Sequence, residues 1–342
     1  MQKLKTLAII YVIMVLAIGC SDNNDDEQLL FKHGSPRPKC RYNADPGRVA
    51  YYSEPVVVAT DWAEPVRLAG PLTDQCPNDA VEISRDGKTI YFFWSPTVEG
   101  TNEELLHIHT GTYYAERVGD DPGLFTNPLF FDLQKGAEGG SVDGSPSFTP
   151  DGAYVYFHST RAENLGFHHS PPTDDYLDIY VAPIIDGEPG PAVNPGEPVN
   201  SIYLDGEHTL SPDGSQLFLT STRPGGLGGP DIWVSTKTDG LWSEPVNLGA
   251  PVNSAEWDGQ PGFAAGDPNT MYFVSRRDGP SSIYRSTFNG ENWSEPEMVI
   301  TGYVGEPSLV EDGSLMYFVH VLVDDNGVFG SNIWYVKRKE TP

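Results

Sequence analysis

Basic residues are scarce in this chain. Its 342 residues include 21 Lys and Arg but 48 Asp and Glu, which gives a formal net charge of -27. A surface of that sign repels phosphate backbones and anionic lipid headgroups, so we expect no nucleic-acid partner. The charge is compatible with cationic partners, divalent ions or neutral glycans.

Long hydrophobic runs are also lacking. The longest, residues 7–18 ("LAIIYVIMVLAI"), follows two lysines and is too short to span a bilayer comfortably. It ends in Gly19-Cys20, and "AIGC" resembles a bacterial lipobox. This resemblance implies a signal peptide over residues 1–19, lipidation of Cys20 and, with Ser21 next, a lipid-anchored place at the bacterial outer membrane, facing the periplasm or the cell surface. The alternative is an ordinary secretory signal with a chance cysteine.

Cysteine is nearly absent, with three residues in all. Apart from Cys20, the chain has Cys40 and Cys76, and two thiols in an oxidising compartment favour one disulfide. That bond would join an N-terminal arm to the first repeat; two unpaired thiols are the alternative. We therefore divide the mature chain into an acidic tether and N-terminal arm, residues 20–50, and a single domain, residues 51–342.

Turn residues and aromatics, in contrast, are plentiful. The chain has 36 Gly, 30 Pro, 17 Tyr, 15 Phe and 7 Trp. Many turns with many aromatics are typical of short β-strands, so the sequence predicts an all-β protein.

One phrase occurs five times. Each copy has a short apolar strand, a turn containing aspartate and then an aromatic strand, as in "PSFTPDGAYVYFHST" and "HTLSPDGSQLFLTST". The turn aspartates are Asp86, Asp151, Asp213, Asp267 and Asp312. Their side chains can bond the turn backbone, and the glycine that usually follows accepts a positive φ. Steps of 45 to 65 residues fit a four-stranded sheet with its loops.

These repeats resemble the TolB-type propeller repeat, a WD-like blade with a Ser-Pro-Asp-Gly signature, over about residues 55–340. The resemblance implies a β-propeller. Five phrases predict five four-stranded blades, in a ring closed by the terminal segments 55–68 and 331–340. A six-bladed ring with a degenerate blade in residues 96–140 is the alternative. The fold alone does not define an activity.

A propeller would place the loops that lead into each innermost strand on one face, together with the loops that leave each second strand. Loops on a rigid ring often carry function. We therefore predict a ligand-binding ring on this face, made of Asp79, Asp143, Asp205, Glu207, His208, Asp258, Gln260, Glu306, Arg161, Arg223 and Arg276. The inserted loop 161–178 adds His168, His169, Asp174 and Asp175. The alternative is that the recurring Asp and Arg form structural ion pairs between blades.

Metal and catalytic motifs are weak. There is no GxSxG, HExxH or phosphate-binding glycine loop. His107 and His109 share one face of a predicted strand, yet no cysteine or third histidine has zinc spacing. We predict no metal site, and no cofactor is firmly implied; calcium held by carboxylates at the channel mouth or at residues 324–327 is the one candidate.

These observations favour a monomeric, non-enzymatic module that binds an envelope protein or a glycan and touches the membrane only through its lipid. TolB-like propellers are similar in holding partner proteins. The alternative is a glycan-active hydrolase or lyase, because glycosidases need two carboxylates across the scissile bond. Its catalytic candidates are Asp79, Glu207, His208 and Glu306. A purely structural component of a larger envelope complex is a third possibility.

Overall fold

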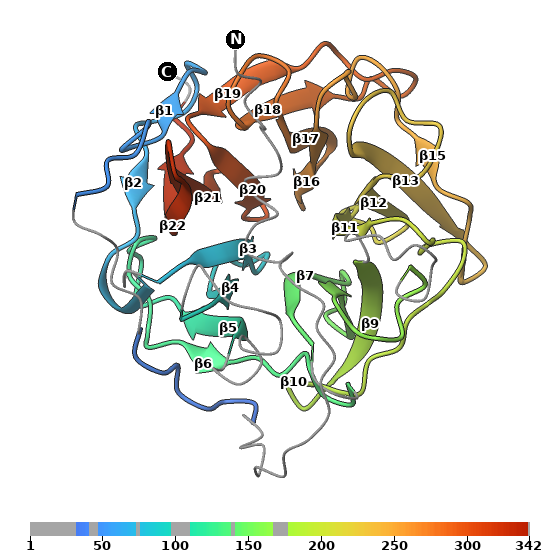
Figure 1. Ribbon diagram of the computed structural model, residues 1–342, viewed down its shortest axis with the longest axis horizontal. Coiled ribbons are helices and arrows are strands. Elements are labelled where there is room, and N and C mark those ends of the chain that lie inside the picture. The colour runs from blue at the N-terminus through green and yellow to red at the C-terminus, as the bar shows by residue number, and fades with distance from the viewer. Residues whose placement is uncertain are drawn as a thin grey trace.

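The protein is a five-bladed β-propeller in the computed structural model (Figure 1). The structure describes residues 32–40, 47–72, 76–96, 110–137, 141–166 and 177–340. Five antiparallel sheets stand around a central axis, and the one helical element within these ranges is the 3-10 turn η2 (Gly70–Leu72). The predicted all-β class and the five blades are confirmed.

The first three blades follow one another along the chain, each beginning with its innermost strand. Blade 1 consists of β3 (Asn78–Ile83), β4 (Thr89–Trp94), β5 (Gly111–Glu116) and β6 (Leu129–Phe130). Blade 2 consists of β7 (Asp143–Phe148), β8 (Tyr154–Ser159), β9 (Asp178–Ile185) and β10 (Glu188–Pro189). Blade 3 consists of β11 (Asp205–Leu210), β12 (Gln216–Ser221), β13 (Asp231–Thr238), β14 (Leu241–Trp242) and β15 (Val246–Asn247). Because β5 and β6 complete blade 1, the alternative of a sixth blade in residues 96–140 is wrong.

The last two blades are completed by the N-terminal part of the chain. Blade 4 consists of β16 (Asp258–Ala264), β17 (Asp267–Ser275), β18 (Ser282–Thr287) and β19 (Glu297–Thr301), with β1 (Val56–Val57) added at its edge. Blade 5 consists of β20 (Val304–Leu309), β21 (Leu315–Asp324), β22 (Gly327–Lys337) and the outer strand β2 (Val66–Arg67). Pairing of β2 with β22 closes the ring in the way that the terminal segments predict.

The repeated turn owes its shape to its own side chains. In the third copy, the Ser211 hydroxyl donates to Asp213 at 2.6 Å and the Ser215 N–H donates to the same carboxylate at 3.0 Å. Gly214 between them has a φ of 73°, which a glycine adopts without steric cost. The Ser-Pro-Asp-Gly phrase is therefore a local device that joins the innermost strand to the second strand.

Each pair of neighbouring blades shares a buried apolar cluster. The aromatic and aliphatic side chains in these clusters come from the first three strands and the loops that follow them. Representative members from adjoining blades are Phe92 with Tyr317, Phe131 with Phe157, Tyr156 with Leu219, Phe218 with Phe273, and Val274 with Phe318. The junction between blades 5 and 1 is packed like the others, so the ring is closed by the same apolar burial that stacks consecutive blades.

Every innermost strand carries a β-bulge at the same place. The pairing with the second strand shifts register there in all five blades. The residue at the bulge has a left-handed φ between 42° and 58°, although none is glycine; these bulge residues are Ala80, Ser145, Glu207, Gln260 and Glu306. Such strain in non-glycine residues is concentrated at functional sites. It makes the bulge the first place to search for one.

Blades approach closely beside the bulges. A Cβ on Gly259 would lie 2.6 Å from the Thr220 hydroxyl, and one on Gly262 would lie 2.1 Å from the carbonyl oxygen of Pro307. Glycine precedes the bulge residue in four blades, whereas blade 1 has Asp79 there. Blade 1 thus places a carboxyl group where the other blades have only backbone.

The N-terminal arm is fastened to blade 1. Its backbone bonds to β6 through the Gly34 N–H, which donates to Phe130 at 2.9 Å, and the Phe130 N–H, which donates to Ser35 at 2.8 Å. A disulfide joins Cys40 to Cys76, just before β3, as the sequence predicts. Among the described residues, no helix has the length and apolarity needed to cross a membrane.

Candidate functional site

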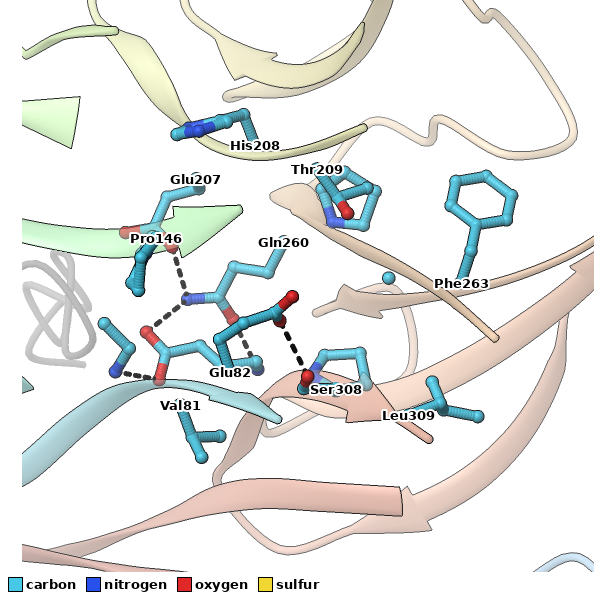
Figure 2. Close-up of a pocket in the computed structure, with 16 residues that line it drawn as sticks. Val81, Glu82, Pro146, Glu207, His208, Thr209, Gln260, Phe263, Ser308 and Leu309 are labelled. Atoms are coloured by element: carbon cyan, nitrogen blue, oxygen red, sulfur yellow. Dashed lines mark hydrogen bonds between the residues drawn. The ribbon is translucent and has the colours of Figure 1, made fainter. Parts of the chain in front are cut away.

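A cavity lies on the propeller axis, and all five innermost strands contribute to its wall (Figure 2). Its volume is about 60 Å³, which is room for about four or five water molecules. Its wall runs from the bulge residues to side chains near the Asp-Gly turns, such as Phe263 and Leu309. This channel cavity therefore lies deeper than the strand starts, where the sequence places the ligand-binding ring. The bulges cause the difference, because they present the residue two positions inside each strand to the axis.

A carboxamide bridges two carboxyl groups in the cavity. The Gln260 Nε2 donates to Glu207 at 3.2 Å and to Glu306 at 3.4 Å. The Glu306 N–H donates back to the Gln260 Oε1 at 3.1 Å, so blades 4 and 5 are bonded in both directions. Figure 2 shows the Glu207 and Gln260 side chains pointing toward one another. The three predicted residues are thus brought together.

Blade 1 adds two further carboxyl groups, of which Glu82 lines the cavity and Asp79 does not. Asp79 forms a hydrogen bond with the carboxyl group of Glu306, which also accepts from the Ala80 N–H. The Ser308 hydroxyl donates to Glu82 at 2.7 Å and accepts from the Ile83 N–H at 2.9 Å. We call Asp79, Glu82, Glu207 and Glu306 the acid cluster.

Burial keeps the acid cluster protonated toward neutral pH. Burial, and then the nearby charge of Asp79, raise the pKa of Glu207 to about 8, although the Gln260 hydrogen bond opposes the shift. Burial likewise raises the pKa of Glu82 to about 7, and with the charges of Asp79 and Glu207 it raises that of Glu306. The pKa of Asp79 is raised by burial too. Lys and Arg are both missing from the residues that line the cavity.

The histidines beside the acid cluster do not supply the missing positive charge. His158 accepts the Glu207 N–H at its Nδ1, at 3.2 Å, and His208 lines the cavity. Burial lowers the pKa of His158 to about 3 and that of His208 to about 4. Both imidazoles are therefore neutral at pH 7.

These shifts predict that stability falls as pH rises above about 6.5 toward about 8. In that window folded Glu207 holds a proton that the unfolded chain, with a pKa of 4.5, has lost, so the unfolded state is favoured by up to about 1.4 kcal/mol per pH unit and group. Below about 6.5 the lowered histidine pKa values act in the opposite direction. Urea unfolding across this range should show the slope in the wild type and a shallower one in Glu207→Gln. Equal slopes would contradict the prediction.

The other predicted carboxylates are paired with arginine. Asp143 lies 3.8 Å from Arg161, Asp258 lies 2.8 Å from Arg277, and Asp205 bonds Arg223. All three Asp side chains are buried and none lines the cavity. Each pair joins the start of an innermost strand to the residues after the second strand of the same blade. The expected pairs between blades are therefore wrong; the pairs stabilise single blades.

The arginine predicted for blade 4 is shifted by one residue. Arg277 pairs with Asp258, whereas the Arg276 guanidinium lies over Trp257, 5.6 Å from the ring centroid. In blades 2 and 3 the pairing arginine comes two residues after the serine that ends the second strand, and the same count from Ser275 gives Arg277. Alignment on that serine is the signal that identifies the correct residue.

Several predicted residues lie outside the described ranges. They are Cys20, His107, His109, His168, His169, Asp174 and Asp175. At the calcium candidate 324–327, Asp324 bonds Arg48 and Asp325 bonds the Tyr51 hydroxyl. In the part of the chain that the structure describes, no group of three or more His, Cys, Asp or Glu is arranged to hold a metal ion.

Glu82 is the site residue that sequence reasoning missed. It stands four residues before the turn Asp86, and the same place holds Ser147, Thr209 and Ser308 in three other blades. A position-by-position alignment of the repeats therefore contains the signal. Interpreting it requires knowing that this position faces the axis, and the bulge decides that.

Comparisons with known proteins agree on the fold. No protein-family model and no curated protein matches the sequence. The chain is similar to a solved structure described as a glycoside hydrolase (12% identity, 81% of this chain and 91% of that one, TM-score 0.51). It is also similar to an α-L-arabinofuranosidase from Lactobacillus brevis (11% identity, 78% of this chain and 92% of that one, TM-score 0.46).

A further similar structure is TolB from Acinetobacter baumannii (14% identity, TM-score 0.43). The match covers 79% of this chain and only 56% of that TolB chain, so this protein spans about half the length of that TolB. The structure described as a glycoside hydrolase, at 12% identity and a TM-score of 0.51, supports the fold alone. This chain is a five-bladed β-propeller, the fold that its repeats predict.

Proposed function

We propose that this protein is a non-catalytic binding module of the bacterial envelope that engages a protein or a glycan through its propeller. The carrying observation is the Gln260 carboxamide, whose Nε2 is hydrogen-bonded to both Glu207 and Glu306. In a glycosidase the two carboxyl groups flank the scissile bond. Here an amide of the protein occupies the space between them, and the cavity is small.

Attachment to the outer membrane through Cys20 is part of this proposal. The signal-like residues 1–19 support it, and so does the Cys40–Cys76 disulfide, because such bonds persist in oxidising compartments. In a Gram-negative host the wild type should fractionate with outer membranes and incorporate radiolabelled palmitate. Cys20→Ser should lose the label, and Ser21→Ala should retain it. An unlabelled wild type would refute the anchor.

A glycan hydrolase is the second candidate. Two observations favour it. The half-buried Glu207 and the buried Glu306 have no basic partner among the described residues, and the pKa of Glu207 is raised, as a general acid requires. The similar structure described as a glycoside hydrolase agrees with it at the level of fold.

Turnover separates the two candidates. The purified protein is incubated with a panel of soluble polysaccharides, while binding is followed by calorimetry and product by reducing ends or unsaturated termini. The proposed function predicts no product from any polysaccharide, including any that binds. Product that falls about 100-fold or more in Glu207→Gln or Glu306→Gln, but not in the exposed Glu291→Gln, would establish the hydrolase or lyase instead.

A further inference from the structure

The channel cavity contains an uncompensated set of acceptors. Three buried aspartates elsewhere, Asp143, Asp205 and Asp258, each have an arginine partner. Asp178 and Asp231 are buried as well, and each is bonded by neutral amide donors. The acid cluster has no Lys or Arg among the residues that line the cavity. The nearby bases are the two buried histidines and Arg85, whose charge acts on Glu82.

Polar atoms at this site also lack partners. Asp79, next to the lining residue Ala80, is 6% exposed and bonded to Glu306, and its Oδ1 accepts no hydrogen bond in the structure. His208 is equally buried and lines the cavity, and neither ring nitrogen has a close hydrogen-bond partner. A buried polar atom without a partner costs free energy, and a ligand that donates to it recovers that cost.

The size and the polarity of the cavity restrict the ligand. Glu82, Glu207 and Thr209 keep part of their surface exposed, so solvent reaches the space. A volume of about 60 Å³ admits a narrow chain rather than a sugar ring. A primary ammonium group supplies three N–H donors and one positive charge, and it suits carboxyl oxygens better than a hydroxyl does. Metal ions fit less well, because the described side chains form no metal-ligating group.

We propose that the channel cavity binds a primary ammonium group at the end of an unbranched chain, namely a lysine side chain of a partner protein. The assignment rests on the proposed binding function, since it specifies the group that the partner inserts. Glu207 and Glu306 accept from the ammonium beside the Gln260 amide, with Glu82 next to them on the cavity wall. The net charge of -27 attracts a cationic partner from a distance.

Calorimetry of the full mature protein with n-butylammonium chloride tests this directly. We expect one saturable site, with 1-butanol and tetramethylammonium failing to bind. Bound ammonium favours ionised carboxyl groups, so protons should be released, and the measured heat should differ between phosphate and Tris buffers. The groups that could release or take up protons there are Asp79, Glu82, Glu207, Glu306, His158 and His208.

Variants and a spectroscopic probe connect the binding to the cavity. Glu306→Gln should weaken n-butylammonium binding about tenfold or more, whereas the exposed Glu291→Gln should not change it. If Glu306→Gln fails to fold, binding can be followed in the wild type by NMR of the Gln260 side-chain amide. Its resonances should shift when n-butylammonium is added, because that amide contacts Glu207 and Glu306.

Several results would overturn the assignment. The assignment is wrong if n-butylammonium shows no saturable binding, if Glu306→Gln binds it with the wild-type affinity, or if the Gln260 resonances do not shift. It is also wrong if glucosamine, potassium or calcium binds more tightly than n-butylammonium. A lysine peptide should bind and its Nζ-acetylated form should not; equal binding would also refute it. Failure with n-butylammonium leaves the proposed function standing, and polysaccharide turnover would refute that function without affecting the ammonium site.

Discussion

Arg223→Leu is expected to lower the free energy of unfolding by about 3–5 kcal/mol. Arg223 bonds the Asp205 carboxylate and donates to the Val199 carbonyl at 2.8 Å. The side chain of Asp205 is 0% exposed and that of Arg223 only 10%, so water cannot replace the lost guanidinium. The variant leaves a buried negative charge with only neutral donors, such as the Ser221 hydroxyl at 2.6 Å. Urea unfolding followed by tryptophan fluorescence measures the change.

Two comparisons show whether the buried charge is responsible. Arg223→Leu combined with Asp205→Asn should recover part of the loss, because the double variant buries no charge. Lys88→Ala removes an exposed ion pair, in which Lys88 lies 3.0 Å from Asp86. Those side chains are 70% and 55% exposed, so we expect a loss of at most about 1 kcal/mol. A loss in Arg223→Leu no larger than in Lys88→Ala would refute the structural role of the Asp-Arg pairs.

Removing the disulfide is expected to lower the free energy of unfolding by about 2–4 kcal/mol. Cys40 and Cys76 close a loop with a sequence separation of 36, and β1 and β2, which complete blades 4 and 5, lie inside it. Without the bond the unfolded chain gains freedom. The folded arm is then held by backbone hydrogen bonds such as Gly34 to Phe130 and by side-chain contacts such as Arg37 over Trp94. Urea unfolding of Cys40→Ala/Cys76→Ala measures the loss.

Reductant and hydrogen exchange provide the matched controls for the disulfide. Dithiothreitol should destabilise the wild type by the same amount and leave the double variant unchanged. Amide exchange should accelerate at Gly34 and Arg37, which donate to blade 1, and change little at Phe92 in the middle of β4. Unfolding curves of the wild type that coincide with and without reductant would contradict the prediction.

Much of the propeller can be predicted from short stretches of sequence. The Asp213 turn is held by Ser211, Ser215 and Gly214, all within five residues, so the phrase indicates its own conformation. Five such turns, each followed by an aromatic strand, predict five blades. Cys40 and Cys76 were likewise predictable, because only one pair remains after the lipobox cysteine is set aside.

The sequence analysis selected several residues that meet at the candidate site, but it did not predict how they are arranged. Glu207, Gln260, Glu306 and Asp79 were selected from the sequence, and they meet in the structure. The same reasoning grouped them with Asp143, Asp205 and Asp258, which are buried in ion pairs away from the cavity. The two sets differ by one or two positions along each strand, and a β-bulge, which sequence patterns do not locate, decides which residue faces the axis.

The sequence by itself therefore determined the number of blades, their turns and the closure of the ring by both termini, because local hydrogen bonding and strand periodicity act over a few residues. Tertiary structure alone decided the contact of Asp79 and Ala80 with Glu306, more than 200 residues away along the chain. It also decided that the Asp-Arg pairs lie within single blades and away from the cavity. Such contacts depend on where side chains from separate blades project once the ring is closed, and on burial, which removes water as the competing partner.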